Sequence, residues 1–288
     1  MEKTNMNFTR LAKRSLDLVW KQKSLWLFGF FAIAGGGTAA NNGLTRKGSG
    51  GGMADVSDFP AWVWPVLAVV VGIGFVALIM HVVSEAALID GVKRAETADQ
   101  PSVTTGLQSG RRNFWRVVGV KLALGALSAL AALVMAAPAL LAVFDLLPVW
   151  LAVVLSVPAL IIGVPVLLSL QFVTQYALRI AVLDDVGVGA AIGRARVHLQ
   201  GRVVDSVKLL LLAFVAQAAG SMATVACLIP GAALGVGVWA LTDAVIPAVA
   251  VGAILSAPFA AMALGATGAL RSTVWTLGFL EGRAEALS

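Results

Sequence analysis

The chain has 288 residues, of which 59% are hydrophobic and only 12% charged, and its mean hydropathy is +0.90. Such a composition excludes an ordinary soluble domain and predicts a polytopic membrane protein. The net charge of +6 comes from 21 basic residues that gather at the ends of apolar runs, which favours membrane topology over nucleic-acid binding. The single cysteine, Cys227, lies within an apolar run and allows no internal disulfide.

The first 23 residues predict a basic amphipathic helix that lies in a headgroup layer, because Lys and Arg alternate with apolar residues at helical spacing. The next run, SLWLFGFFAIAGGG from Ser24, is short for a membrane span. A signal peptide is the competing interpretation, since a basic region precedes the run and small residues follow it. The glycine-rich residues 35–59 are typical of a flexible linker.

An Asp followed closely by a Pro precedes a long apolar segment three times, at Asp58, Asp145 and Asp243. The corresponding prolines, Pro60, Pro148 and Pro247, are 88 and 99 residues apart. An N-cap Asp accepts a backbone N–H that has no partner in the helix, and Pro is well suited to the first turn. The sequence therefore predicts three long helices that begin at one membrane face.

Two more basic segments, from Leu107 and from Gly189, each precede a further apolar run. We expect an all-α integral membrane protein with six transmembrane helices, arranged as three repeated hairpins, each preceded by a basic amphipathic interfacial helix. The chain would form a single membrane domain, 1–288, with repeat units of about 1–95, 96–185 and 186–288. Residues 232–242 are apolar but glycine-rich, and either extend the fifth span or form a re-entrant piece.

Counting basic residues predicts the orientation of these spans. If the N-terminus is internal, Arg46 and Lys47 are the only basic residues outside, and the other 19 of the 21 lie inside. We therefore expect a multi-pass protein of the bacterial inner membrane with both termini in the cytoplasm.

Few polar residues lie within the apolar segments, and we expect them to gather near the inner headgroups as a polar or lipid-binding site. His81 and Glu85 lie four residues apart, so they share a helix face. The repeat places them opposite Gln171 and Gln175. They are either interfacial side chains that pair with one another or meet lipid phosphates, or part of a substrate or ion site. The predicted set is His81, Glu85, Gln171, Gln175, Arg179 and Arg271.

We predict no catalytic residues, metal site or cofactor, because only two neighbouring metal ligands occur and no hydrolase or phosphate-binding motif is present. Basic residues around the entry segments instead predict a collar that attracts anionic lipids. The predicted basic collar consists of Lys23, Arg111, Arg112, Arg116, Lys121, Arg194, Arg196, Arg202 and Lys208. Small residues at four-residue spacing, such as Ala257, Ala261 and Gly265, predict close helix packing or a face for a membrane-protein partner.

The order of a basic helix, a short WLFGFFAIAGGG run, a Gly-rich loop and a helix ending in EAALIDGVKRAE is similar to a group of bacterial integral membrane proteins. That group includes the membrane domain attached to some glycerophosphodiester phosphodiesterases, whose catalytic domain this chain lacks. The hypothesis is a non-enzymatic inner-membrane scaffold or partner subunit with a basic face that binds anionic lipids. The alternative is a small permease or lipid-handling carrier with a polar site between the repeats.

Overall fold

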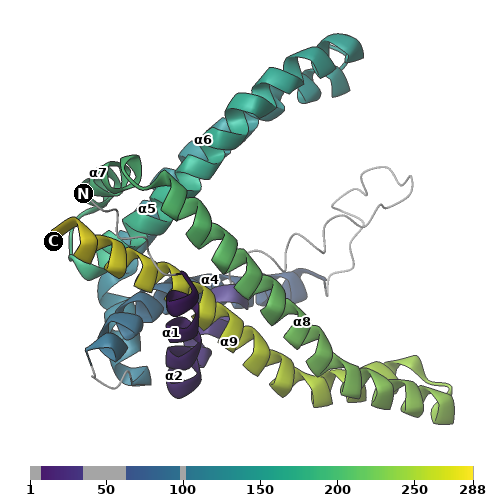
Figure 1. Cartoon of the computed structure of the whole chain (residues 1–288). Coiled ribbons are helices and arrows are strands. Elements are labelled where there is room, and N and C mark those ends of the chain that lie inside the picture. The colour runs from purple at the N-terminus through teal and green to yellow at the C-terminus, as the bar shows by residue number, and fades with distance from the viewer. Residues whose placement is uncertain (1–7, 35–62, 98–101, 288) are drawn as a thin grey trace. The chain divides into compact units, whose positions relative to one another are not determined.

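The computed structural model describes residues 8–34, 63–97 and 102–287, and this part of the chain is entirely helical. Five of its helices are long and apolar enough to cross a membrane, which confirms the all-α class and supports a multi-pass membrane protein. The eight helices are α1 (Phe8–Lys21), α2 (Ser24–Ala34), α4 (Val63–Glu96), α5 (Val103–Val143), α6 (Val149–Leu183), α7 (Val188–Gln200), α8 (Val203–Thr242) and α9 (Val245–Leu287) (Figure 1).

The first apolar run forms a helix of only 11 residues, α2. At about 1.5 Å per residue this helix is about 17 Å long, which is less than the roughly 30 Å of hydrocarbon in a bilayer. A sixth span is therefore absent from the helices of the described ranges. The predicted linker and its neighbours Asp58 and Pro60 lie outside the described residues.

The chain divides into two compact units. Unit 1 consists of residues 1–111 and 210–288, and unit 2 of residues 112–209. Helices α5 and α8 each continue from one unit into the other, so the first turns of α5 belong to unit 1 and the first turns of α8 to unit 2.

The core of unit 1 is built around the short helix α2, which packs against both α9 and α4. Glycines make the contact with α9 very close, because a Cβ added at Gly29, Gly265 or Gly268 would overlap the backbone of the facing helix. A Cβ added at Gly106, at the start of α5, would likewise overlap a part of α2, the side-chain ring of Phe28. The apolar character of α2 therefore serves protein packing along much of its length.

Burial along the long helices α4 and α9 changes abruptly from one end to the other. In α4, most side chains from Trp64 to Leu78 are exposed, whereas most from Val82 to Val92 are buried. In α9, exposed residues predominate up to Met262 and buried ones from Gly265 to Phe279. Helix α1 covers this buried part of α9, and its own buried residues are Leu11, Ser15 and Val19.

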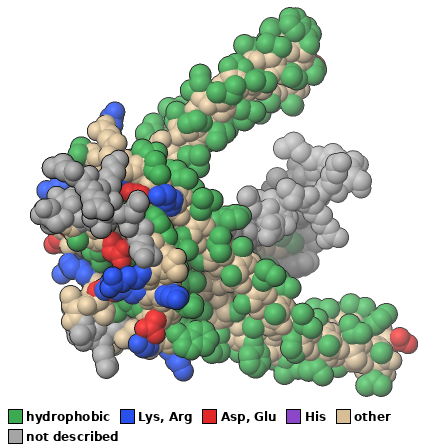
Figure 2. Space-filling view, in the orientation of Figure 1, with side chains coloured by type: hydrophobic (Ala, Val, Ile, Leu, Met, Phe, Trp, Pro, Cys, Tyr) green, Lys and Arg blue, Asp and Glu red, His purple; other side chains and the backbone are tan. Residues whose placement is uncertain are grey.

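Unit 2 contains a hairpin formed by α5 and α6, with α7 packed against α6. At the crossing of the hairpin, a Cβ added at Gly163 would lie 2.6 Å from the sulfur of Met135. Burial in α6 follows the same pattern as in α4 and α9, since the buried run begins at Phe172 and ends at Val182. Figure 2 shows the arms of the α5–α6 and α8–α9 hairpins covered by hydrophobic side chains.

The structure corrects the predicted role of Asp145 and Asp243. Both adopt left-handed backbone conformations, with φ of 57° and 49°, at the end of a helix. The N–H of Leu146 donates to the carbonyl of Leu141 at 2.9 Å, which is the closing hydrogen bond of a Schellman motif. Helix α6 instead begins after Pro148, without a side-chain cap hydrogen bond. These aspartates therefore end the preceding helix, because Asp is among the few residues that tolerate positive φ.

One predicted boundary is wrong. The second basic segment is not a separate interfacial helix, because α5 is continuous from Val103 through the apolar run to Val143. Of the two alternatives for residues 232–242, the structure has the helical one, since they extend α8 and Pro230 lies inside that helix without ending it. Prolines are tolerated in membrane helices, where neighbouring helices and hydroxyl side chains satisfy the freed carbonyls.

Candidate functional site

The predicted polar residues divide between the two units. In unit 1, His81 and Glu85 are half-buried on α4, at the boundary between its exposed and buried lengths, and Arg271 is exposed on α9. In unit 2, Gln171 is exposed and Gln175 half-buried on α6.

Arg179 is the most buried charged residue of the predicted set, with 3% of its surface exposed. Its Nη1 donates a hydrogen bond of 3.0 Å to Oε1 of Gln175, one turn earlier on α6. A buried guanidinium in a membrane helix requires such polar partners. The structure therefore brings Arg179 and Gln175 together, and a polar site made by residues from all three repeats stays a prediction.

A polar contact beside Arg179 was missing from the sequence-based prediction. The hydroxyl groups of Tyr176 and Ser206 are 2.8 Å apart, which joins α6 to the start of α8 within unit 2. The ring of His198, on α7, meets the ring of Tyr176 edge to face at 5.0 Å. Tyr176 is the only tyrosine of the chain, which was the one signal in the sequence that could have marked it.

Members of the predicted basic collar form ion pairs with carboxylates of unit 2. Arg116 pairs with Asp185, Arg194 with Asp184 at 3.6 Å, and Lys208 with Asp205 at 3.8 Å. Arg111, Arg112, Arg196 and Lys23 are exposed, and Lys121 and Arg202 are half-buried.

A second set of ion pairs holds α1 in unit 1. Arg14 contacts Glu96 at the end of α4, and its Nη1 lies 3.9 Å from Glu281 near the end of α9. From the sequence, Arg14 is expected to lie among headgroups with the other basic residues of the first segment. Its ion pairs with the two glutamates were not predicted. The ion pairs tie the N-terminal helix to the ends of two candidate spans.

Large apolar side chains are exposed next to these basic residues. On α1, Trp20 is 67% exposed and Leu16 55%, and each directly follows a buried residue, Val19 and Ser15 respectively, about 100° further around the helix. On α5, Trp115 is 79% exposed beside Arg111 and Arg112, and on α7, Val197 is 70% exposed beside Arg196. Exposed Trp and aliphatic residues mixed with Lys and Arg are typical of helices at a membrane interface.

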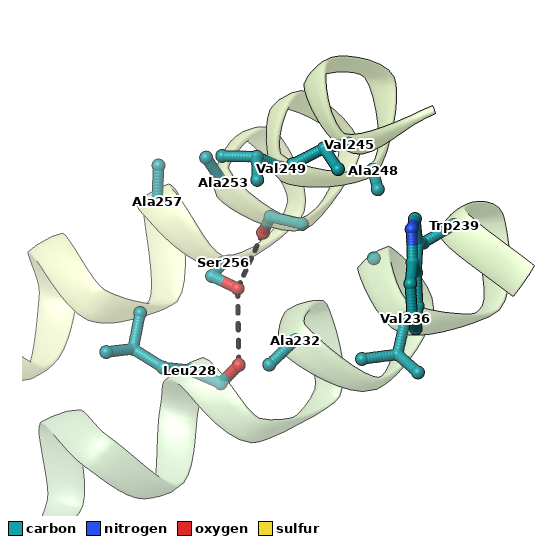
Figure 3. Close-up of a pocket in the computed structure, with 12 residues that line it drawn as sticks. Leu228, Ala232, Val236, Trp239, Val245, Ala248, Val249, Ala253, Ser256 and Ala257 are labelled. Carbon is teal, nitrogen blue, oxygen red and sulfur yellow. Dashed lines mark hydrogen bonds between the residues drawn. The ribbon is translucent and has the colours of Figure 1, made fainter. Parts of the chain in front are cut away.

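A groove of about 620 Å³ runs along the seam between α8 and α9 in unit 1. Its walls carry apolar side chains from both helices, as Figure 3 shows for Val236 and Trp239 of α8 and Val249 and Ala253 of α9. Ser256 is the one hydroxyl residue in the lining, and its Oγ donates to the carbonyl of Gly252 at 2.8 Å. Nothing in the sequence marks this groove as distinct from the rest of the apolar surface.

No family model, curated protein or solved structure matches this chain. The similarity to the group of bacterial membrane proteins therefore stays a prediction.

Among the described residues, no group of three or more His, Cys, Asp or Glu side chains could hold a metal ion. The chemistry available at the sites above is the recognition of charge by Arg and Lys, and of hydrocarbon by exposed apolar surface. Both are properties of a surface that meets lipid.

Proposed function

We propose that the chain is a non-enzymatic scaffold or partner subunit of the bacterial inner membrane, with six crossings and a basic cytoplasmic face that binds anionic lipids. The observation that carries this proposal is the exposure of basic residues together with Trp20, Trp115 and Val197 on the three entry segments. Large apolar side chains left exposed beside basic ones favour a surface seated among headgroups over one in free solution.

A comparison of helices supports the sixth crossing. Helices α1 and α7 are followed, after a break of two residues, by α2 and α8 respectively. The buried residues of α1, Leu11, Ser15 and Val19, correspond to Ala191, Ala195 and Leu199 of α7, each 180 positions later in the chain. Helix α2 thus holds the same position after α1 that α8 holds after α7. Because α8 is a candidate span of 40 residues, this correspondence supports a crossing that begins at α2.

The charge distribution supports a cytoplasmic location for the basic face. The exposed collar residues Arg111, Arg112 and Arg196 lie outside the apolar arms, in segments that the positive-inside rule assigns to the cytoplasm. Each Lys or Arg near a membrane surface contributes on the order of 1 kcal/mol to the attraction of anionic lipid.

Anionic-lipid binding is tested with the double variant Arg111→Gln and Arg112→Gln in mixed bilayers of phosphatidylglycerol and phosphatidylethanolamine. At about 1 kcal/mol per charge, we expect the loss of two charges to lower the preference for phosphatidylglycerol by roughly 30-fold. Energy transfer from the protein to fluorescent phosphatidylglycerol measures this preference.

The matched control is the double variant Arg46→Gln and Lys47→Gln, which removes the same charge from the segment predicted to lie outside. It should retain the lipid preference. Equal losses in both variants, or no loss in either, would contradict a basic face specific to the entry segments.

A further inference from the structure

The apolar lengths of α8 and α9 carry almost no charged or carboxamide side chains. Arg271 is the one ionisable side chain of α9 between Val245 and Glu281, and Gln217 is the one carboxamide of either helix. At about 1.5 Å per residue, Arg271 lies about 39 Å along α9 from Val245, and Gln217 about 38 Å along α8 from Thr242. The guanidinium and the carboxamide are therefore at the same level of the hairpin.

The packing of α8 against α9 brings these two residues to facing sides of the helices. A Cβ added at Gly220 would overlap the side chain of Thr267, so the two helices touch at this pair. Gln217 is three residues before Gly220, and Arg271 is four residues after Thr267. Because residues three or four apart share a helix face, Gln217 and Arg271 both lie at the α8–α9 seam, one turn beyond this contact.

The burial of Gln217 is not explained by packing. Its Oε1 is buried and has no hydrogen-bond partner among the described residues. An unpaired buried acceptor is unfavourable, and an apolar side chain of similar size, such as leucine, would avoid its cost. With Oε1 turned into the protein, the NH₂ group at the other end of the amide is the end that can donate to a ligand.

The level of the two residues identifies the class of ligand. When α8 and α9 cross a bilayer, the Asp243 turn lies at one face. The bilayer is about 40–45 Å thick with its headgroups, so a distance of about 39 Å reaches the headgroups of the opposite leaflet. The anions at that level are lipid phosphates. Arg271 is exposed there, and a guanidinium binds phosphate through two parallel hydrogen bonds.

We propose that Arg271 and Gln217 bind the phosphate of a phospholipid headgroup in the leaflet opposite the Asp243 turn. The phosphate oxygens accept hydrogen bonds from the guanidinium of Arg271 and from Nε2 of Gln217. This site deepens the proposed function and rests on one part of it, the crossing of the bilayer by α8 and α9. It is separate from the basic collar, none of whose residues lies in α9.

The test measures the binding of phosphatidylglycerol to the full chain in detergent micelles by native mass spectrometry over a range of lipid concentrations. Arg271→Gln should weaken the tightest binding step about tenfold, because charge-assisted hydrogen bonds to the phosphate are lost. Gln217→Leu should weaken it about fivefold, which corresponds to one hydrogen bond. Gln217→Leu should not lower the melting temperature, because the buried Oε1 has no hydrogen bond to lose.

Arg196→Gln is the matched control, because it removes the same charge from an exposed collar residue of α7. It should leave the tightest binding step unchanged. A second arm adds inorganic phosphate at the same concentrations as the lipid, and this phosphate should not displace the lipid. An unchanged melting temperature verifies that Arg271→Gln and Arg196→Gln are folded.

Equal losses with Arg271→Gln and Arg196→Gln, or no loss with Arg271→Gln, would overturn the phosphate site and leave the basic face intact. A Gln217→Leu variant that melts at a lower temperature and binds the lipid as tightly as the natural chain would overturn the assignment of Gln217. Displacement by inorganic phosphate would identify a site for free phosphate and overturn the lipid headgroup as the ligand. Alkaline phosphatase fusions after Asp243 and after Leu287 that report the same side of the membrane would instead contradict the crossing itself.

Discussion

Three aspartates with left-handed backbone geometry, Asp145, Asp185 and Asp243, each follow the end of a long helix. A short polar side chain tolerates this conformation better than an apolar one, and it stays solvated at the end of a membrane helix. Asp185 has a second role, since its carboxylate pairs with Arg116 of α5. At Asp185 the same residue therefore provides both the positive φ of the turn and the carboxylate of the ion pair.

The variant Asp145→Gly distinguishes a helix-ending role from an N-cap role. Glycine removes the steric cost of positive φ, so the variant should be as stable as the natural chain or up to about 1 kcal/mol more stable. An N-cap Asp would instead lose stability, by a few tenths of a kcal/mol, on replacement by Gly. Thermal unfolding in detergent measures the difference, and Asp145→Ala should destabilise by about 1 kcal/mol in both cases.

Helix α2 shows how glycine spacing determines which elements can meet. Gly29 on α2 and Gly265 and Gly268 on α9 bring the two backbones into direct contact. The nitrogen Nε1 of Trp26 also donates to the carbonyl of Val19 at 2.9 Å, which fixes the angle between α2 and α1. A short helix thus becomes the centre of unit 1, because small residues let its neighbours approach closely.

The variant Gly268→Ala should destabilise unit 1 by about 1–3 kcal/mol, because the added methyl group would overlap the backbone of Gly29. Gly72→Ala, on the exposed arm of α4, is the control, since nothing lies within 4 Å of the added Cβ. It should be neutral or more stable by up to about 1 kcal/mol, the difference in helix propensity. Equal effects of the two variants on the melting temperature would exclude a tight α2–α9 crossing.

At the scale of the whole molecule, the exposed apolar lengths agree with the thickness of a bilayer. From its start to the first buried run, α4 has an exposed arm of about 27 Å, α9 one of about 30 Å and α6 one of about 34 Å. Hydrocarbon is about 30 Å thick. The arms of α9 and α6 are long enough to cross the hydrocarbon, and the α4 arm is about 3 Å shorter than its thickness. The buried length that follows each arm, such as Phe172–Val182 of α6, lies near or beyond the headgroups.

Reporter fusions test the orientation that these arms imply. Alkaline phosphatase joined after Lys47, Asp145 or Asp243 should be active, because the predicted topology places these positions outside the cytoplasm. Fusions after Asp185 or Leu287 should be inactive as phosphatase and fluorescent as green fluorescent protein. Because α4 and α5 together cross twice, the fusions after Lys47, Asp145 and Asp243 report the same side whether or not α2 crosses. A label at the N-terminus decides the count, since an external N-terminus with the other outcomes unchanged would remove the first crossing and leave five.

The sequence alone determined the helical class, the long apolar segments and the basic segments beside them. It could do so because hydrocarbon forces every backbone group to bond within its own helix, so local composition decides what spans a membrane. The pairing of Arg179 with Gln175 was also predictable, because residues four apart share a helix face.

Only the tertiary structure decided which charges pair with carboxylates, which glycines face another helix and where the α8–α9 groove lies. Arg14, in a basic segment near the N-terminus, contacts Glu96, 82 positions away. Gly72 and Gly268 both lie in apolar helices, and only Gly268 meets a backbone. These differences depend on which distant segments come together, and that information is spread over the whole chain.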